Sequence, residues 1–227
     1  MPDPHDQWIA SLLSMTGTPE LASTFLDGRL EFTTQVAQEL SRSSEGEPHV
    51  VYAVWIETHD VPVYIGQTEN GPRRMWDLPI GESHHLSNSF PPEIWGRIVV
   101  VRWGELLRKY EPDLEPVFLG LESAGFTETA QQWEAIGLGL EHLLQSRDRP
   151  LMNRRTKKRD GSWRTVTWSG SRSRGARAAP HLGPLFEKVD EVWKVLCSTA
   201  PGPDGATLIV DHGLAVFPAL LRRRFSA

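Results

Sequence analysis

Five polar residues in this chain have the types needed to hydrolyse a phosphodiester bond. They are Tyr52, Tyr64, Arg74, Glu141 and Asn153. Such hydrolysis requires an attacking water that loses a proton, positive charge on the phosphate, and help for the leaving oxygen. A divalent cation can supply the last two. Because a hard cation such as Mg²⁺ keeps several waters and needs few carboxylates, a single glutamate on a helix is a suitable protein ligand, and Glu141 is the candidate.

The other residues in this set each have a possible role and a simpler alternative. Arg74 offers planar, charged donors to phosphate oxygens, although its neighbour Arg73 could compete for that role. The Tyr52 phenol could take the proton of the water if a nearby cation lowers its pKa. Asn153 could hold Glu141 or a phosphate oxygen, or it could simply cap a helix end. Two tyrosines on a hairpin, taken alone, are usually partners in a core.

The order and spacing of these residues resemble the GIY-YIG nuclease superfamily. The chain has Val50-Val51-Tyr52, then Tyr64-Ile65-Gly66, and Arg74 follows Gly66 by eight residues. Asn153 follows Glu141 by twelve residues and stands three after Pro150, which matches the P-x-x-N ending of the family. The resemblance covers residues 49–78 and 95–154, which is 90 of the 227 residues.

The resemblance implies a fold, an activity and a role for each tyrosine. The expected core is a small antiparallel three-stranded sheet flanked by helices, within the α+β class. The expected activity is endonucleolytic cleavage of DNA with Mg²⁺ or Mn²⁺, leaving 5′-phosphate and 3′-hydroxyl ends. Tyr52 would be the general base, and Tyr64 would orient the water or bind the scissile phosphate. Gly66 would let the backbone approach the site closely.

One position departs from the family pattern. A His or Tyr is expected four residues after the Arg, and this chain has Leu78 there. Pro79 follows directly, and it predicts that the helix after Arg74 is only about one turn long. The next loop contains His84 and His85. Because a His has both donor and acceptor nitrogens and a pKa near neutrality, we hypothesise that one of them returns to the site and takes the vacant role.

Hydrophobic patterning predicts the elements that would position these residues. Residues 49–57, 62–67 and 97–103 read as strands, and residues 129–146 read as a helix that Pro150 ends. Residues 1–47 form a helical extension in this interpretation, residues 48–154 a nuclease core with an insertion at about 104–128, and residues 155–227 a basic strip with a C-terminal α/β extension. That extension contains a helix at 184–197 and a hairpin at 207–217.

Charge is distributed unevenly along the chain. The formal net charge is −5, yet eleven basic and only two acidic residues lie between Arg147 and Arg177. A basic strip on an acidic body can hold a polyanion, because screening makes the placement of charge matter more than its total. A solvated basic loop is the simpler alternative. The candidate nucleic-acid-binding residues are Arg73, Arg154, Arg155, Lys157, Lys158, Arg159, Trp163 and Arg164.

Composition narrows the cellular setting. Cys197 is the only cysteine, so no disulfide can form within the chain. The N-terminus is acidic and polar, and no apolar run approaches the roughly 18 residues needed to span a bilayer. We therefore expect a cytoplasmic protein without a membrane partner, and the sequence leaves a homodimer open.

Three functions are compatible with these observations. A metal-dependent DNA endonuclease of a restriction or defence system is favoured. A structure-selective nuclease of DNA repair or recombination is the main alternative among enzymes. A nucleic-acid-binding module that does not cut is the alternative from another class, since Leu78 replaces a family residue. Retention of all five polar groups argues against that module, because a site without activity has no reason to keep them.

Overall fold

The computed structural model describes residues 31–42, 45–57, 59–81, 85–153 and 173–225. Several sequence predictions lie outside these residues. They are the return of His84 and the basic segment with Arg154, Arg155, Lys157, Lys158, Arg159, Trp163 and Arg164. His85 begins a short helix, but its side chain also lies outside the description.

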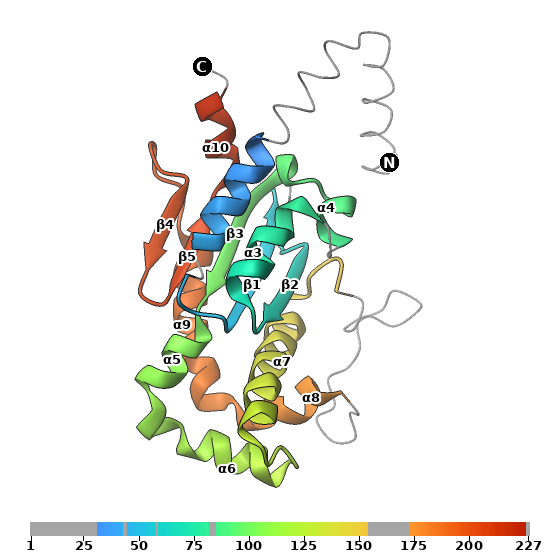
Figure 1. Ribbon diagram of the computed structural model, residues 1–227, viewed down its shortest axis with the longest axis vertical. Helices are drawn as coiled ribbons and strands as arrows, with labels where there is room; N and C mark the ends of the chain where they lie inside the picture. Colours follow the sequence, from blue (N-terminus) through green and yellow to red (C-terminus); the bar gives the residue numbers. More distant parts are fainter. Residues whose placement is uncertain (1–30, 43–44, 58, 82–84, 154–172, 226–227) are drawn as a thin grey trace.

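A five-stranded antiparallel sheet forms the centre of the molecule, in the order β2-β1-β3-β5-β4 (Figure 1). The strands are β1 (Val50–Ile56), β2 (Tyr64–Thr68), β3 (Trp95–Val101), β4 (Thr207–Val210) and β5 (Gly213–Val216). The general α+β class is therefore correct, but the prediction of a three-stranded sheet is wrong. The C-terminal hairpin joins the sheet through β5, which pairs with β3 from Ile98 to Val101. Without β5, the apolar strand β3 would be an exposed sheet edge.

Alternation along β1 divides the interior into two cores. Val51 and Ala53 face one core, and Val50, Tyr52 and Val54 face the other. All seven residues of β1 are buried, because helices cover both faces of the sheet. A central strand with a continuous apolar run follows from this double cover.

The core that contains Val51 is covered by helices from the second half of the chain. They are α5 (Trp103–Lys109), α6 (Glu115–Ser123), α7 (Thr129–Asp148) and α9 (Gly183–Ser198). A 3₁₀ turn at Glu111–Leu114 joins α5 to α6, and these elements form the region predicted as an insertion. Short segments α8 (Arg174–Ala178) and a 3₁₀ turn at Ala179–His181 pack against α7.

The core that contains Tyr52 is covered by helices from both ends of the described chain. Residues 31–42 are helical and contribute Phe32, Val36 and Leu40 to it. The other helices on this side are α3 (Gly71–Ile80), α4 (His85–Ser89) and α10 (Pro218–Phe225), and a 3₁₀ turn at Pro92–Ile94 leads into β3. Figure 1 shows the helix of residues 31–42 and α3 lying across the same side of the sheet.

Helix α3 is longer than the sequence predicted. We expected about one turn after Arg74, but the helix continues through Pro79 to Ile80, so that prediction is wrong. Gly81 ends it with a φ of 86°, and its N–H donates to the Asp77 carbonyl. Burial of Leu78 and Pro79 in the core stabilises this last turn despite the missing proline N–H. Leu78 is therefore a core residue.

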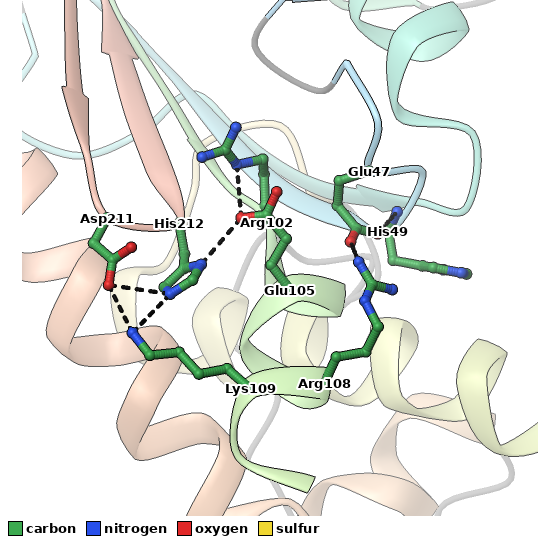
Figure 2. Close-up of polar contacts among 8 residues, drawn as sticks. All are labelled: Glu47, His49, Arg102, Glu105, Arg108, Lys109, Asp211 and His212. Atoms are coloured by element: carbon green, nitrogen blue, oxygen red, sulfur yellow. Dashed lines mark hydrogen bonds and ion pairs between the residues drawn. The ribbon is translucent and has the colours of Figure 1, made fainter.

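A set of polar contacts fastens the β4–β5 hairpin to α5 (Figure 2). Lys109 Nζ lies 2.8 Å from Asp211 Oδ2 and 2.9 Å from His212 Nε2. His212 Nδ1 lies 3.0 Å from Glu105 Oε2, which also pairs with Arg102. We call these five residues the α5 network. His212 has a φ of 61° at the hairpin turn, and its carbonyl accepts from the Arg102 N–H.

No helix within the described ranges has both the length and the apolar composition needed to cross a membrane.

Candidate active site

Tyr52 and Tyr64 lie side by side on one face of the β1–β2 hairpin. Tyr52 pairs with Gly66 and Tyr64 with Val54, so the two tyrosines are diagonal neighbours. Their ring centroids are 6.0 Å apart with an interplanar angle of 33°. A hydrogen bond joins the two side chains. Tyr52 is fully buried, whereas Tyr64 is half-buried, so the pair leads from the core towards the surface.

Gly66 allows this arrangement because it has no side chain. A Cβ at this position would lie 2.6 Å from Tyr64 Cε1 and 2.8 Å from the Tyr52 hydroxyl oxygen. Both phenols therefore lie directly over the Gly66 backbone. The sequence predicted a close approach at Gly66, and the structure shows that the approaching groups include the two phenols themselves.

Arg74 and Glu141 lie close enough to Tyr52 to change the pKa of its phenol. Burial raises this pKa well above its ordinary value near 10, and the neighbouring Tyr64 raises it further. The charge of Glu141 also raises it, and the charge of Arg74 lowers it. Groups from β2, α3 and α7 thus change the pKa of one phenol on β1. The phenol is held in its neutral form.

Arg74 reaches the site from the first turn of α3. Its backbone N–H donates to the Asn70 carbonyl at 2.9 Å. It lies between the exposed Arg73 and the buried Met75 in sequence and is itself half-buried, so it stands on the flank of the helix. Its side chain is half-buried, and Nη1 is inaccessible to solvent and has no hydrogen-bond partner among the described residues. Its rival Arg73 is exposed on the outer side of the helix. Arg74 is thus the better placed to bind an anion at the tyrosines.

Gln145 connects Glu141 to strand β2. One turn after Glu141 on α7, its Nε2 donates to Glu141 Oε1 at 2.5 Å and to the Ile65 carbonyl at 3.0 Å. Gln145 is almost fully buried. We did not select this residue from the sequence, although its spacing of four from Glu141 places both on one helix face.

Asn153 holds the backbone of the same residue, Ile65. Its Oδ1 accepts from the Ile65 N–H at 2.8 Å, and its Nδ2 donates to the Ile65 carbonyl at 2.7 Å. The preceding residues Leu151 and Met152 donate to the carbonyls of Pro62 and Val63. The amide of Asn153 is therefore engaged at both ends. Asn153 positions β2 beside α7 and is poorly placed to bind a phosphate.

The donor set around Glu141 suits a hydrated hard cation. One half-buried carboxylate, with an oxygen held by Gln145, provides a fixed anionic ligand. The described residues contain no cluster of three or more His, Cys, Asp or Glu that could hold an ion. Mg²⁺ and Mn²⁺ do not require such a cage, because they retain waters and bind substrate phosphate oxygens. A closed, protein-only zinc site would not fit these residues.

The ends of the basic run make contacts within the protein. Arg147 pairs with Asp148 and Asp190, and Arg174 pairs with Glu134. The Arg177 guanidinium carbon lies 4.8 Å from the centre of the Phe126 ring. At least three of the eleven basic residues are therefore committed to the fold, which reduces the charge that the run could offer to nucleic acid.

Comparison of the chain with protein-family models, with curated proteins and with solved structures finds no match in any of the three. The functional argument therefore depends on the residues and their geometry.

Proposed function

We propose that this protein is a metal-dependent endonuclease of the GIY-YIG type that hydrolyses phosphodiester bonds in DNA. One observation carries the proposal. Tyr64, Arg74 and Glu141 come from three separate elements, and all three change the pKa of the buried Tyr52 phenol. An arginine with a buried donor that has no partner among the described residues stands beside them. Arg74 Nη1 is one of several such atoms among the described residues, and its place beside Tyr52 singles it out; an anion that binds there in the working state would satisfy it.

The residues divide the chemical work among themselves. Arg74 would donate to a non-bridging phosphate oxygen, and Tyr64 would hold the hydroxyl of Tyr52 in place. Glu141 would hold Mg²⁺ or Mn²⁺, which supplies charge stabilisation at the phosphate when bound. Tyr52 is the candidate acceptor for the proton of the water. Its raised pKa sets a condition, because positive charge beyond that of Arg74 must stand beside it before it can act at neutral pH.

Gln145 and Asn153 are positioning residues in this proposal. Both bind the backbone of Ile65, which lies between Tyr64 and Gly66. They therefore fix the distance between the glutamate helix and the tyrosine strand. Because a displacement of about 1 Å can cost 10²-fold in rate, such residues matter without touching the substrate.

The subclass of enzyme follows less directly. A restriction or defence enzyme acting on cytoplasmic DNA, as a monomer or a homodimer, suits the elements added around the tyrosine hairpin. A structure-selective nuclease is the second candidate, and the exposed Trp76 on α3 favours it. A binding module that does not cut would have no use for the Glu141–Gln145 pair.

A plasmid-nicking assay tests the proposal. Wild-type protein should nick supercoiled plasmid in Mg²⁺ or Mn²⁺ and stop in EDTA, leaving 5′-phosphate and 3′-hydroxyl ends. Glu141→Gln should lower the rate about 10³-fold or more, while DNA binding changes by no more than about threefold. Glu134→Gln is the matched control on the same helix and should cut normally.

Each outcome of this assay has a defined meaning. Cutting by Glu141→Gln at near the wild-type rate would overturn the site assignment. Binding without cutting by the wild type, with either metal, would support the non-cutting module instead. Sequencing the ends separates the subclasses, because fixed sites indicate restriction and dependence on branches or flaps indicates a structure-selective enzyme.

A further inference from the structure

The outer face of α3 carries an exposed stripe of one basic and two large apolar residues. Arg73, Trp76 and Ile80 are three and four positions apart, which places them on one side of the helix. Trp76 is 41% exposed and Ile80 is 38% exposed. Trp76 is the only aromatic residue among the large hydrophobic side chains that the structure shows as exposed. The informative feature is that Trp76 and Ile80 lie together beside Arg73 on one face of α3, since a single exposed apolar side chain would be ordinary.

This stripe lies next to the candidate active site. At 100° per residue, the outer side of α3 carries Arg74, the half-buried Asp77, Arg73 and Trp76 in that order. Arg74 lies on the side of α3 that faces the tyrosines, and Trp76 lies past Arg73 on the far side of the exposed surface of the helix. The helix is only about 10 Å wide, so a strand bound at Arg74 needs only a few nucleotides to reach Trp76. Arg74, Arg73 and Trp76 thus mark a path that leads out of the site.

The backbone beneath this path is rigid. Met75, Leu78 and Pro79 anchor the opposite side of α3 in the core, and Gly81 caps its end. The backbone that carries Trp76 is therefore fixed in place. Little conformational entropy would be lost when a ligand stacks on it.

The composition of the path suits a nucleic-acid strand with exposed bases. Alternating cationic and aromatic side chains bind single strands, because the cations contact phosphates and the aromatic rings stack on bases. In an intact duplex, the faces of each base are covered by the neighbouring base pairs. A ring such as Trp76 can stack only on a base that has left the helical stack. The surface therefore discriminates between paired and unpaired DNA.

We propose that Trp76 stacks on an unpaired nucleobase of the DNA strand being cut, while Arg73 contacts an adjoining phosphate. The preferred substrate is then DNA with a single-stranded segment, such as a flap or a fork, within a few nucleotides of the scissile bond. This inference rests on the proposed nuclease function in its second, structure-selective form, and it names the substrate class of the same site.

The test compares forked DNA with fully paired DNA of the same sequence. Binding is measured by fluorescence anisotropy in EDTA, and cleavage is measured in Mg²⁺. Trp76→Ala should weaken binding to the fork by about 10- to 100-fold and binding to the duplex by less than about threefold. Trp76→Phe should retain most of the fork affinity, because it keeps a stacking ring.

Ile80→Ala is the matched control, since Ile80 has similar exposure on the same stripe but cannot stack. It should bind fork and duplex like the wild type. All three variants change an exposed side chain, and unchanged unfolding midpoints would establish that the fold is intact. Arg73→Gln should weaken binding to both DNAs and reduce the salt slope by about one.

The outcomes separate this inference from the proposed function. If the wild type nicks plasmid in a manner that requires Glu141, but Trp76→Ala affects fork and duplex equally, only the stacking inference fails. The same applies if Trp76→Ala has no effect on either DNA. If the wild type does not cut, the nuclease proposal fails, and a selective loss of fork binding in Trp76→Ala would still support the stacking surface.

Discussion

The tyrosine site and the α5 network are both polar clusters on the same sheet, but their charges are balanced differently. In the α5 network, Arg102 and Lys109 face Glu105 and Asp211 at 2.8 to 3.3 Å, with His212 between them. At the tyrosine site, an Arg74 donor is buried without a hydrogen-bond partner among the described residues. In the α5 network both cations have ion-pair partners, although Arg102 Nε, like Arg74 Nη1, makes no hydrogen bond. Arg74 has no ion-pair partner among the described residues, so its guanidinium has capacity to bind an anion.

This difference distinguishes a structural role from a functional one. An unsatisfied buried donor costs about 1–3 kcal/mol, so a fold that keeps one forgoes stability. Partly exposed ion pairs contribute about 0–1 kcal/mol each, but a network of them can fix one element against another. The α5 network joins the C-terminal hairpin to the helix that follows β3. At the tyrosine site, Gln145 and Asn153 link α7 and the chain after it to β2, and Arg74 Nη1 takes no part in that link.

Removing the Tyr52 hydroxyl should give the largest effect. Tyr52→Phe should lower the cleavage rate by about 10²-fold or more if Tyr52 accepts the proton, with little change in DNA binding. Tyr110→Phe is the control, since this third tyrosine lies outside the site. Rates are compared in single-turnover plasmid nicking. If the cleavage rate of Tyr52→Phe stays within a few-fold of wild type, the general base is another group. The contrast between the tyrosine site and the α5 network would then be weaker.

Adding a methyl group at Gly66 should disturb the site without unfolding the sheet. The nearest atoms to the new Cβ are the ends of the Tyr52 and Tyr64 side chains, which can swing aside. We expect Gly66→Ala to lose about tenfold or more in cleavage rate, because the phenols leave their positions. Gly183→Ala, which meets no atom within 4 Å, is the control. Full activity in a folded Gly66→Ala protein would show that the positions of the phenols do not matter.

Disrupting the α5 network should lower stability and leave the cleavage rate unchanged, the reverse of the result expected at Gly66. Glu105→Ala removes the partner of both Arg102 and His212. The free energy of unfolding in urea should fall by about 1 kcal/mol, while cleavage by the folded protein stays within about twofold of wild type. A large loss of cleavage at unchanged stability would mean that the network serves the reaction as well as the fold.

The smallest effect concerns His49, which lies beside the pair of Glu47 and Arg108 (Figure 2). Its ring lies 4.5 Å from Trp133 and 5.1 Å from Trp103, centroid to centroid. Burial lowers the pKa of His49 below its ordinary 6.5, Glu47 partly opposes this, and Arg108 lowers it further. The unfolded chain then binds more protons than the native protein just below pH 6.5, so native stability should fall as the pH drops through that window.

Urea unfolding at pH 7.5 and 5.5 measures this contribution. His49→Gln should lose less stability on acidification than the wild type, because Gln does not titrate. His59→Gln, at an exposed position, should lose as much as the wild type. Equal losses in all three proteins would assign the pH dependence to other groups.

Local geometry explains why much of the site could be predicted. Alternation along two neighbouring antiparallel strands decides which side chains share a face, so a pairing of Tyr52 with Tyr64 could be proposed from their places on the two strands. The helix that carries Glu141 follows from the apolar periodicity of residues 129–146, and the choice of Arg74 follows from its spacing to Gly66 in the family pattern that the chain resembles. The first two of these inferences required only contacts within a hairpin or a helix turn.

Longer-range packing decided the rest. Neither the pairing of β5 with β3 nor the burial that carries α3 through Pro79 is visible in a local pattern, because both depend on surfaces brought from distant parts of the chain. The role of Asn153 changed for the same reason, since its two hydrogen bonds reach back to Ile65 in strand β2. The sequence determined which groups could react. Only the packed structure decided which were left with capacity to bind, because that depends on every neighbour that could have satisfied them.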